Sequence, residues 1–199
     1  RPCSYDDLDC IRKFFSENSA CSPAYGPIPD PLVVTYTALP IPHANLTFIN
    51  DDAQVSGLKN VVVKEFYINK STGRFVLEVE YEEIVLSCPK ATIRYHLRGR
   101  EPVERSDTFY IAIRKVSITM VVPYENGIQL SKGQVFTYFA DSNVSYSLGP
   151  NFVSSDPGLQ KSLFLLLAKL PTTLQEAYLI VGPHYLSVFI ESNLCKFTK

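Results

Sequence analysis

Residues 74–88 alternate apolar and polar side chains, and the alternation reverses midway. Apolar side chains occupy odd positions up to Tyr81 and even positions from Ile84 onward. Successive side chains of a β-strand point to opposite faces, so a strand changes its apolar face only through an extra residue. We therefore predict a β-bulge near Glu82-Glu83.

Residues 108–122 repeat this pattern. Their apolar positions are odd up to Ile113 and even from Val116 onward, with the switch at Arg114-Lys115. Two long strands that each bend in the middle favour a strongly curved sheet over a flat sandwich.

The remainder of residues 32–148 is also typical of β-structure. Two β-branched runs precede the polar stretch Asn69–Gly73, which predicts the turn of a hairpin. Asn126-Gly127 predicts a further turn, and one more strand is expected from Gln134 to Ser147.

Helical spacing appears on both sides of this β-region. A short amphipathic helix is predicted for residues 4–18, capped by Ser4 or Asp6. Asp156 is placed to cap a second helix over residues 157–169, because proline is favoured at the first helical position.

The segment Thr172 to Leu194 predicts a long C-terminal helix that is apolar on nearly all faces. Glu176, His184 and Glu191 are its only strong polar interruptions. A helix of this kind is expected to be enclosed by other structure. The chain is therefore predicted to have an α+β fold, in which a highly curved antiparallel sheet wraps around the C-terminal helix. We expect residues 1–199 to form a single domain.

The most apolar stretches, 163–170 and 177–190, are shorter than the ~18 apolar residues that a membrane-spanning helix needs. We expect no integral membrane association.

Cysteine usage and sequons favour an exported protein. The five cysteines fit no zinc-ligand spacing, so disulfides in an oxidising compartment are expected, with one cysteine free or intermolecular. Asn45, Asn69 and Asn143 each begin a glycosylation sequon, although so short a tripeptide also occurs by chance. We expect a mature, secreted, extracellular glycoprotein from which a signal peptide has been removed.

Several function classes are disfavoured. The chain carries 19 basic and 20 acidic residues, a net charge of −1, which argues against nucleic-acid partners and binding to anionic lipid surfaces. It has no glycine-rich phosphate loop and no nucleophile elbow. His43, His96 and His184 are isolated, which is typical of structural side chains. We expect no enzymatic activity, no catalytic residues, no metal and no cofactor.

Four motifs resemble the insect takeout and haemolymph juvenile-hormone-binding family. They are Arg1-Pro2-Cys3 followed by Cys10-Ile11, the stretch Ile28–Val34, the stretch Val55–Asn60, and Asp156-Pro157-x-Leu159. They occur in order along nearly the whole chain.

Further features resemble the fibrohexamerin branch of that superfamily. Fibrohexamerins are companion glycoproteins of silk fibroin. These features are Cys21, the sequon at Asn45, Cys88-Pro89 and Cys195. The chain has fewer cysteines than this branch is expected to have.

The resemblance implies a disulfide between Cys3 and Cys10. For a second bridge, Cys195 is open to either Cys88 or Cys21. We take Cys88–Cys195 as the candidate pair and leave the partner of Cys21 open.

The resemblance also implies a tubular lipid-binding fold with an apolar tunnel between sheet and helix. Hydroxyls of Tyr138, Tyr178 and Tyr185 are suited to donate to an ester or carboxylate. For any single residue proposed to line this tunnel, ordinary packing in the core explains its apolar side chain equally well. The candidate ligand-binding residues are Phe75, Leu77, Val79, Phe109, Ile111, Phe136, Tyr138, Phe164, Leu167, Tyr178, Val181, Tyr185 and Phe189.

Two functions follow from this resemblance. The first is a carrier of a small hydrophobic ligand, such as a terpenoid hormone, a fatty acid or another lipid, in the haemolymph. The second is a structural companion of silk fibroin chains in the silk-gland lumen, with a reduced or vestigial cavity filled by bulky side chains.

Overall fold

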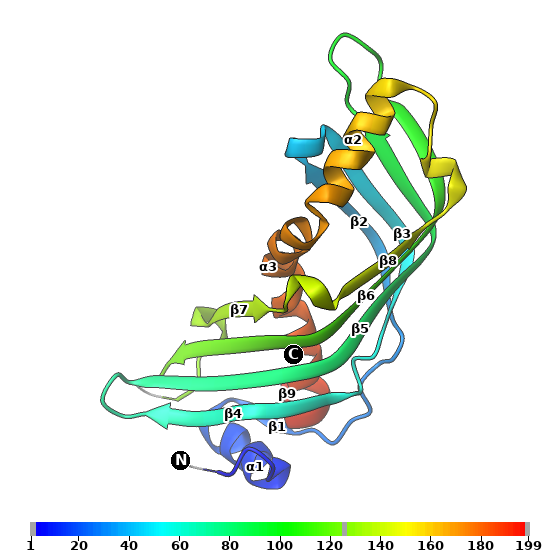
Figure 1. Cartoon of the computed structure of the whole chain (residues 1–199). Coiled ribbons are helices and arrows are strands. Elements are labelled where there is room, and N and C mark those ends of the chain that lie inside the picture. Colours follow the sequence, from blue (N-terminus) through cyan, green and yellow to red (C-terminus); the bar gives the residue numbers. More distant parts are fainter. Residues whose placement is uncertain (1–2, 125–126, 198–199) are drawn as a thin grey trace.

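The structure is a computed structural model that describes residues 3–124 and 127–197. A curved antiparallel sheet dominates the fold (Figure 1). The strands of this sheet are β2 (Leu32–Ile41), β3 (Leu46–Ser56), β4 (Val61–Asn69), β5 (Arg74–Tyr95), β6 (Val103–Pro123), β7 (Gln134–Tyr138) and β8 (Val144–Leu148). The helices are α1 (Leu8–Asn18), α2 (Pro157–Ala168) and α3 (Leu170–Phe189), and a π-helical turn (Ile190–Leu194) follows α3. A separate two-stranded sheet joins β1 (Cys21–Pro23) to β9 (Cys195–Phe197).

The long strands β5 and β6 form the centre of the large sheet. β3 and β4 pair end to end along β5, and β8 and β7 pair end to end along β6. The sheet therefore has two halves. The lower half contains β4, β7, residues 74–81 and residues 116–123; the upper half contains β2, β3, β8, residues 84–95 and residues 103–113.

The boundary between the halves is the predicted reversal of the apolar face, but the predicted bulge is wrong in its detail. Tyr81 pairs with Val116 and Glu83 pairs with Arg114, so the β5–β6 register is unchanged across the reversal. Both strands change face at opposite positions: Glu82-Glu83 and Arg114-Lys115 each place two consecutive exposed side chains between buried ones. The extra residue of one strand is therefore matched by that of the other, and the register is kept. Lys115 adopts a left-handed φ of 54° there, and its ammonium pairs with the carboxylate of Glu82.

Two other strand predictions need correction. The strand expected from Gln134 to Ser147 is divided into β7 and β8 by a 3-10 turn at Asp141–Asn143. The turn expected at Asn126-Gly127 lies partly outside the described residues, because Asn126 is among those not described. The hairpin at Asn69–Gly73 is confirmed, because Asn69 pairs with Arg74.

The three predicted helices are present. α1 is capped by Asp7, whose carboxylate accepts from the Cys10 backbone N–H at 3.0 Å, and not by Ser4 or Asp6. α2 begins at Pro157 as predicted, with Asp156 as its N-cap. No single described helix is long and apolar enough to cross a membrane; α2 and Leu170–Leu194 meet that test only together, as a pair bent by 71°.

α3 crosses the concave side of the sheet, which confirms the predicted fold class (Figure 1). Tyr178, Tyr185 and Phe189 are buried against the sheet. The expectation that the helix is enclosed on all sides is wrong, because Leu179 and Ile180 are 63% and 71% exposed. One side of α3 therefore faces solvent despite its apolar composition.

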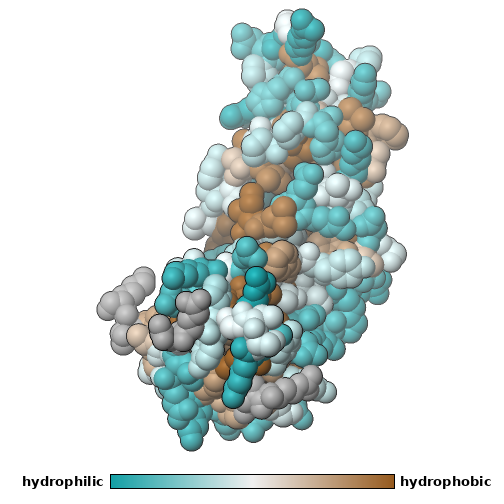
Figure 2. Space-filling view, turned by 90° about the vertical axis from the view of Figure 1, so that its left-hand side faces the viewer, coloured by the Kyte–Doolittle hydropathy of each residue, from teal (hydrophilic) through white to brown (hydrophobic). Residues whose placement is uncertain are grey.

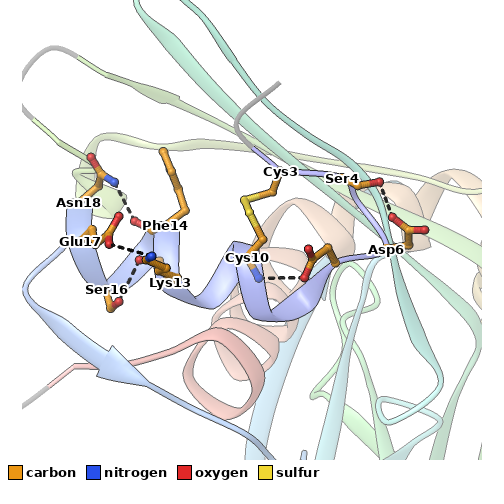
Figure 3. Close-up of a disulfide and its surroundings, with 10 residues drawn as sticks. Cys3, Ser4, Asp6, Cys10, Lys13, Phe14, Ser16, Glu17 and Asn18 are labelled. Carbon is orange, nitrogen blue, oxygen red and sulfur yellow. Dashed lines mark hydrogen bonds and ion pairs between the residues drawn. A yellow bond between two sulfur atoms is a disulfide. The ribbon is translucent and has the colours of Figure 1, made fainter.

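The disulfides confirm one predicted pair and correct the other. Cys3 is bonded to Cys10, which ties the segment before α1 to its first turn (Figure 3). Cys195 is bonded to Cys21 and not to Cys88, because the pairing of β1 with β9 brings Cys21 and Cys195 to diagonal positions with Cα atoms 5.6 Å apart. Cys88 forms no disulfide within the described chain and is buried in the upper half. Burial raises the pKa of the Cys88 thiol to about 12, so the thiol stays protonated.

The Cys21–Cys195 bridge is expected to contribute more stability than the Cys3–Cys10 bridge. The two bridges join residues separated by 174 and 7 positions, and the chain-entropy model assigns about 5 kcal/mol to the longer loop and about 2.5 kcal/mol to the shorter. Denaturant unfolding of Cys21→Ala/Cys195→Ala should therefore show a larger loss in unfolding free energy than that of Cys3→Ala/Cys10→Ala. Equal losses would contradict this expectation.

The N-cap of α2 is expected to make stability depend on pH. The guanidinium of Arg100, 2.7 Å from Asp156, together with backbone N–H donors of Gly158 and Leu159, lowers the pKa of Asp156 from 3.8 to about 2. A lowered pKa in the folded state stabilises the protein above the unfolded value, and this stability is lost as pH falls from about 4 through about 2.

Asp156→Asn should therefore have a lower Tm than the parent at pH 7, with a gap that narrows toward pH 2.5. Glu101→Gln, an exposed change beside Arg100, is the control and should show no pH-dependent gap. A gap for Asp156→Asn that keeps its size at pH 2.5 would refute the assignment.

Candidate ligand-binding cavity

A cavity of about 270 Å³ lies in the upper half, between the concave face of the sheet and the helices α2 and α3. Its sheet wall includes Phe48, Phe109 and Ile111, and its helix wall includes Leu170 and Leu174. This volume is slightly below the ~300–1,000 Å³ of ordinary small-molecule sites. The cavity is therefore sized for one small molecule.

The cavity wall is uncharged. Among the described residues that line it there is no Asp, Glu, Lys, Arg or His, and its polar members are Thr37, Asn50, Thr173, Tyr178 and Tyr185. Such a wall gives no electrostatic compensation to a buried ion. It is therefore suited to neutral, mainly apolar molecules.

Two tyrosines from α3 form one side of the cavity. The rings of Tyr178 and Tyr185 meet edge to face with centroids 5.9 Å apart, and the hydroxyl of Tyr81 donates to the Tyr185 carbonyl oxygen at 3.1 Å. Burial raises the pKa of Tyr178 well above its ordinary value and that of Tyr185 to about 12. Both phenols therefore stay neutral.

Asn50 and Thr37 form a polar pair in the sheet wall. They face each other across β3 and β2, and the Asn50 Nδ2 donates to Thr37 Oγ1 at 3.2 Å. The Oδ1 atom of Asn50 is buried and has no hydrogen-bond partner among the described residues.

The cavity brings together five of the thirteen residues nominated from the sequence. Whether they contact a ligand stays a prediction. They are Phe109, Ile111, Tyr178, Val181 and Tyr185.

Four nominated residues lie in the lower half and pack there as core. Phe75, Leu77, Val79 and Phe189 are at most 2% exposed. Aromatic rings from α1 and β4 fill this part: Phe75 lies within 6.1 Å of Phe14, Phe15 and Phe66, measured between ring centroids. The predicted tunnel is therefore filled by side chains around Phe75 in the lower half, and the cavity described above lies in the upper half.

The remaining nominated residues lie outside the cavity. Phe136 and Tyr138 are 55% and 67% exposed, because it is Thr137 of β7 that faces α3, where its Oγ1 donates to the Tyr178 carbonyl oxygen at 3.4 Å. Phe164 is 69% exposed on the outer side of α2. Leu167 is half-buried against the upper core. Alternation within one short strand could not reveal which of its faces meets α3.

Sequence reasoning missed the contribution of β2 and β3. Leu39, Phe48 and Asn50 line the cavity but were not nominated. One available signal was Asn50, an amide that follows Phe48-Ile49 in an apolar strand. A buried amide in such a run needs a hydrogen-bond partner, so an amide at this point of the sequence indicates a polar position inside the core.

A second, more open groove of about 570 Å³ lies between β6, β7 and the C-terminal part of α3. Its wall includes Met120, Leu186 and Ile190, but also Glu191. Because this groove is open to solvent and carries a charge, it is a poorer candidate for sequestering an apolar molecule.

The three sequon asparagines lie outside the cavity wall. Asn45 is exposed, and Asn69 and Asn143 are half-buried at the ends of a strand and a 3-10 turn. The side chain of Asn69 accepts from the Ser71 N–H at 3.1 Å. Glycosylation at these positions stays a prediction.

Comparison with known proteins finds a matching family model, a related sequence and a similar solved structure. The model of the family described as fibroin P25 matches residues 1–199. Fibrohexamerin of Galleria mellonella is 27% identical over 136 residues, which is 62% of this chain and 62% of that protein's length. The crystal structure of takeout 1 from Epiphyas postvittana aligns over 94% of this chain and 88% of its own, with 15% identity and a TM-score of 0.44. The resemblance to fibrohexamerin is confirmed: the chain belongs to the fibroin P25 family.

Proposed function

We propose that this chain is a secreted, non-enzymatic protein that holds one small hydrophobic molecule in the cavity of its upper half. The observation that carries the proposal is the uncharged, largely apolar wall of that cavity. Removing apolar surface from water contributes ~25 cal/mol per Å². An empty apolar cavity also loses dispersion contacts with its lining, which a bound molecule restores.

The contrast between the two halves supports the same proposal. In the lower half, rings of α1, β4 and β5 occupy the concave side, whereas a cavity remains in the upper half of the described chain. The same curved sheet therefore encloses packed aromatic side chains at one end and a hollow at the other. Terpenoids, fatty acids and related lipids fit the chemistry of this hollow.

The test is to purify the secreted protein gently, extract it with organic solvent and identify bound molecules by mass spectrometry. The parent protein should release about one apolar molecule per chain. Ala177→Phe, which adds a ring to a position that lines the cavity, should release much less while it remains folded by circular dichroism. Ala168→Phe, an exposed change on α2, is the matched control and should retain the molecule.

Two outcomes would oppose the proposal. One is a parent protein without a stoichiometric apolar molecule. The other is an Ala177→Phe variant that carries as much of it as the Ala168→Phe control.

A second candidate function is companionship with silk fibroin chains. Family membership supports it, and so do exposed apolar side chains on α2 and α3. Phe164, Leu179 and Ile180 are 69%, 63% and 71% exposed, and hydrophobic residues gather at mid-height on this face (Figure 2). Exposed apolar groupings of this kind mark interaction surfaces.

Co-purification of the tagged chain with fibroin from the silk-gland lumen tests this second function. Phe164→Ser/Leu179→Ser should weaken fibroin capture severalfold, while Val62→Ser, an exposed apolar change on β4, should not. Unchanged capture by the double variant would show that this face is not the contact.

A further inference from the structure

We infer that the cavity selects a neutral molecule with a hydroxyl group, which hydrogen-bonds to the pair formed by Asn50 and Thr37. This inference rests on the proposed function and narrows its ligand to apolar alcohols, in preference to carboxylates or plain hydrocarbons.

The first observation is that the Asn50 amide is only partly satisfied. Asn50 is 8% exposed, its Nδ2 donates to Thr37 Oγ1 at 3.2 Å, and its Oδ1 has no partner within the described chain. A buried carbonyl without a donor destabilises a protein, so such groups are rare in folded chains. Asn50 also lines the cavity, so a bound molecule can supply what the protein does not.

The second observation concerns the setting of the pair. Phe48, two positions before Asn50 and on the same face of β3, packs edge to face with Phe109, with ring centroids 4.6 Å apart. Asn50 and Thr37 thus lie at one polar spot in a wall built mainly from apolar side chains. This arrangement fits a molecule with one polar group and an apolar body.

The third observation decides the charge of the polar group. No described residue in the cavity wall is charged, so a carboxylate would lose its hydration without gaining a counter-ion. A hydroxyl both donates and accepts. It can therefore satisfy the exposed edge of the Asn50 amide whichever way the oxygen and nitrogen of that amide are oriented.

The other polar groups of the wall supply no counter-ion for a carboxylate. Thr173 is already paired, because its Oγ1 donates to the Lys169 carbonyl oxygen at 3.0 Å. Tyr178 and Tyr185 are neutral phenols and add no charge.

The test uses the full-length secreted protein after removal of bound lipid. Decanol, decanoate and decane, which share one chain length, are compared as competitors of a fluorescent apolar probe at pH 7.5. The parent protein should bind decanol at least fivefold more tightly than decane or decanoate, which is the size expected for one neutral hydrogen bond. Asn50→Leu should bind decanol and decane with equal affinity, and Thr37→Val should reduce the preference for decanol.

Stability provides an independent readout. Asn50→Leu replaces a partly satisfied amide by an apolar side chain of similar size, so its ligand-free Tm should equal or exceed that of the parent. Thr35→Val, an exposed change on the same strand as Thr37, is the matched control and should leave all three affinities unchanged.

The outcomes separate the inference from the proposed function. If none of the three compounds binds the parent protein, the proposed function itself is wrong. If all three bind and the preference for decanol is absent, or survives in Asn50→Leu, the cavity holds ligands but the inference is overturned.

Discussion

The pairing of β5 with β6 is the constraint on which the rest of this structure depends. The two strands run 22 and 21 residues, and every other strand of the large sheet pairs with one of them or, for β2, with β3. Their register is the same on both sides of the face reversal at Glu83 and Arg114. The apolar side chains of each half therefore point to the concave side of the sheet. Both cores, the lower one packed with aromatic rings and the upper one with its cavity, follow from this shared geometry.

Much of this architecture was predictable from the sequence, because its causes are local. The two parity switches predicted a curved sheet, and the pair Asp156-Pro157 predicted the start of α2. The apolar C-terminal segment predicted a helix against that sheet. These features depend on neighbours within a few residues, which periodicity and capping rules describe well.

What the sequence could not supply depends on contacts between distant segments. The face of β7 that meets α3 is set by where the helix crosses the sheet, so alternation alone misplaced Phe136 and Tyr138. Likewise, Cys195 meets Cys21 because β9 pairs with β1, a short contact that no pattern indicated. The cavity wall from β2 and β3 was missed for the same reason. Its polar pair exists only because Thr37 and Asn50 are cross-strand neighbours.

The bridge between Cys21 and Cys195 has a mechanical consequence. It joins β1 to β9, the first and last strands of the described chain. Every strand of the large sheet lies between these two cysteines in the sequence. A pulling force applied beyond these two cysteines is carried by a covalent bond and does not reach the ladder of β5 and β6. The curved sheet is therefore shielded from stretching, and its enclosed hollow keeps its shape under tension for as long as that bond is oxidised.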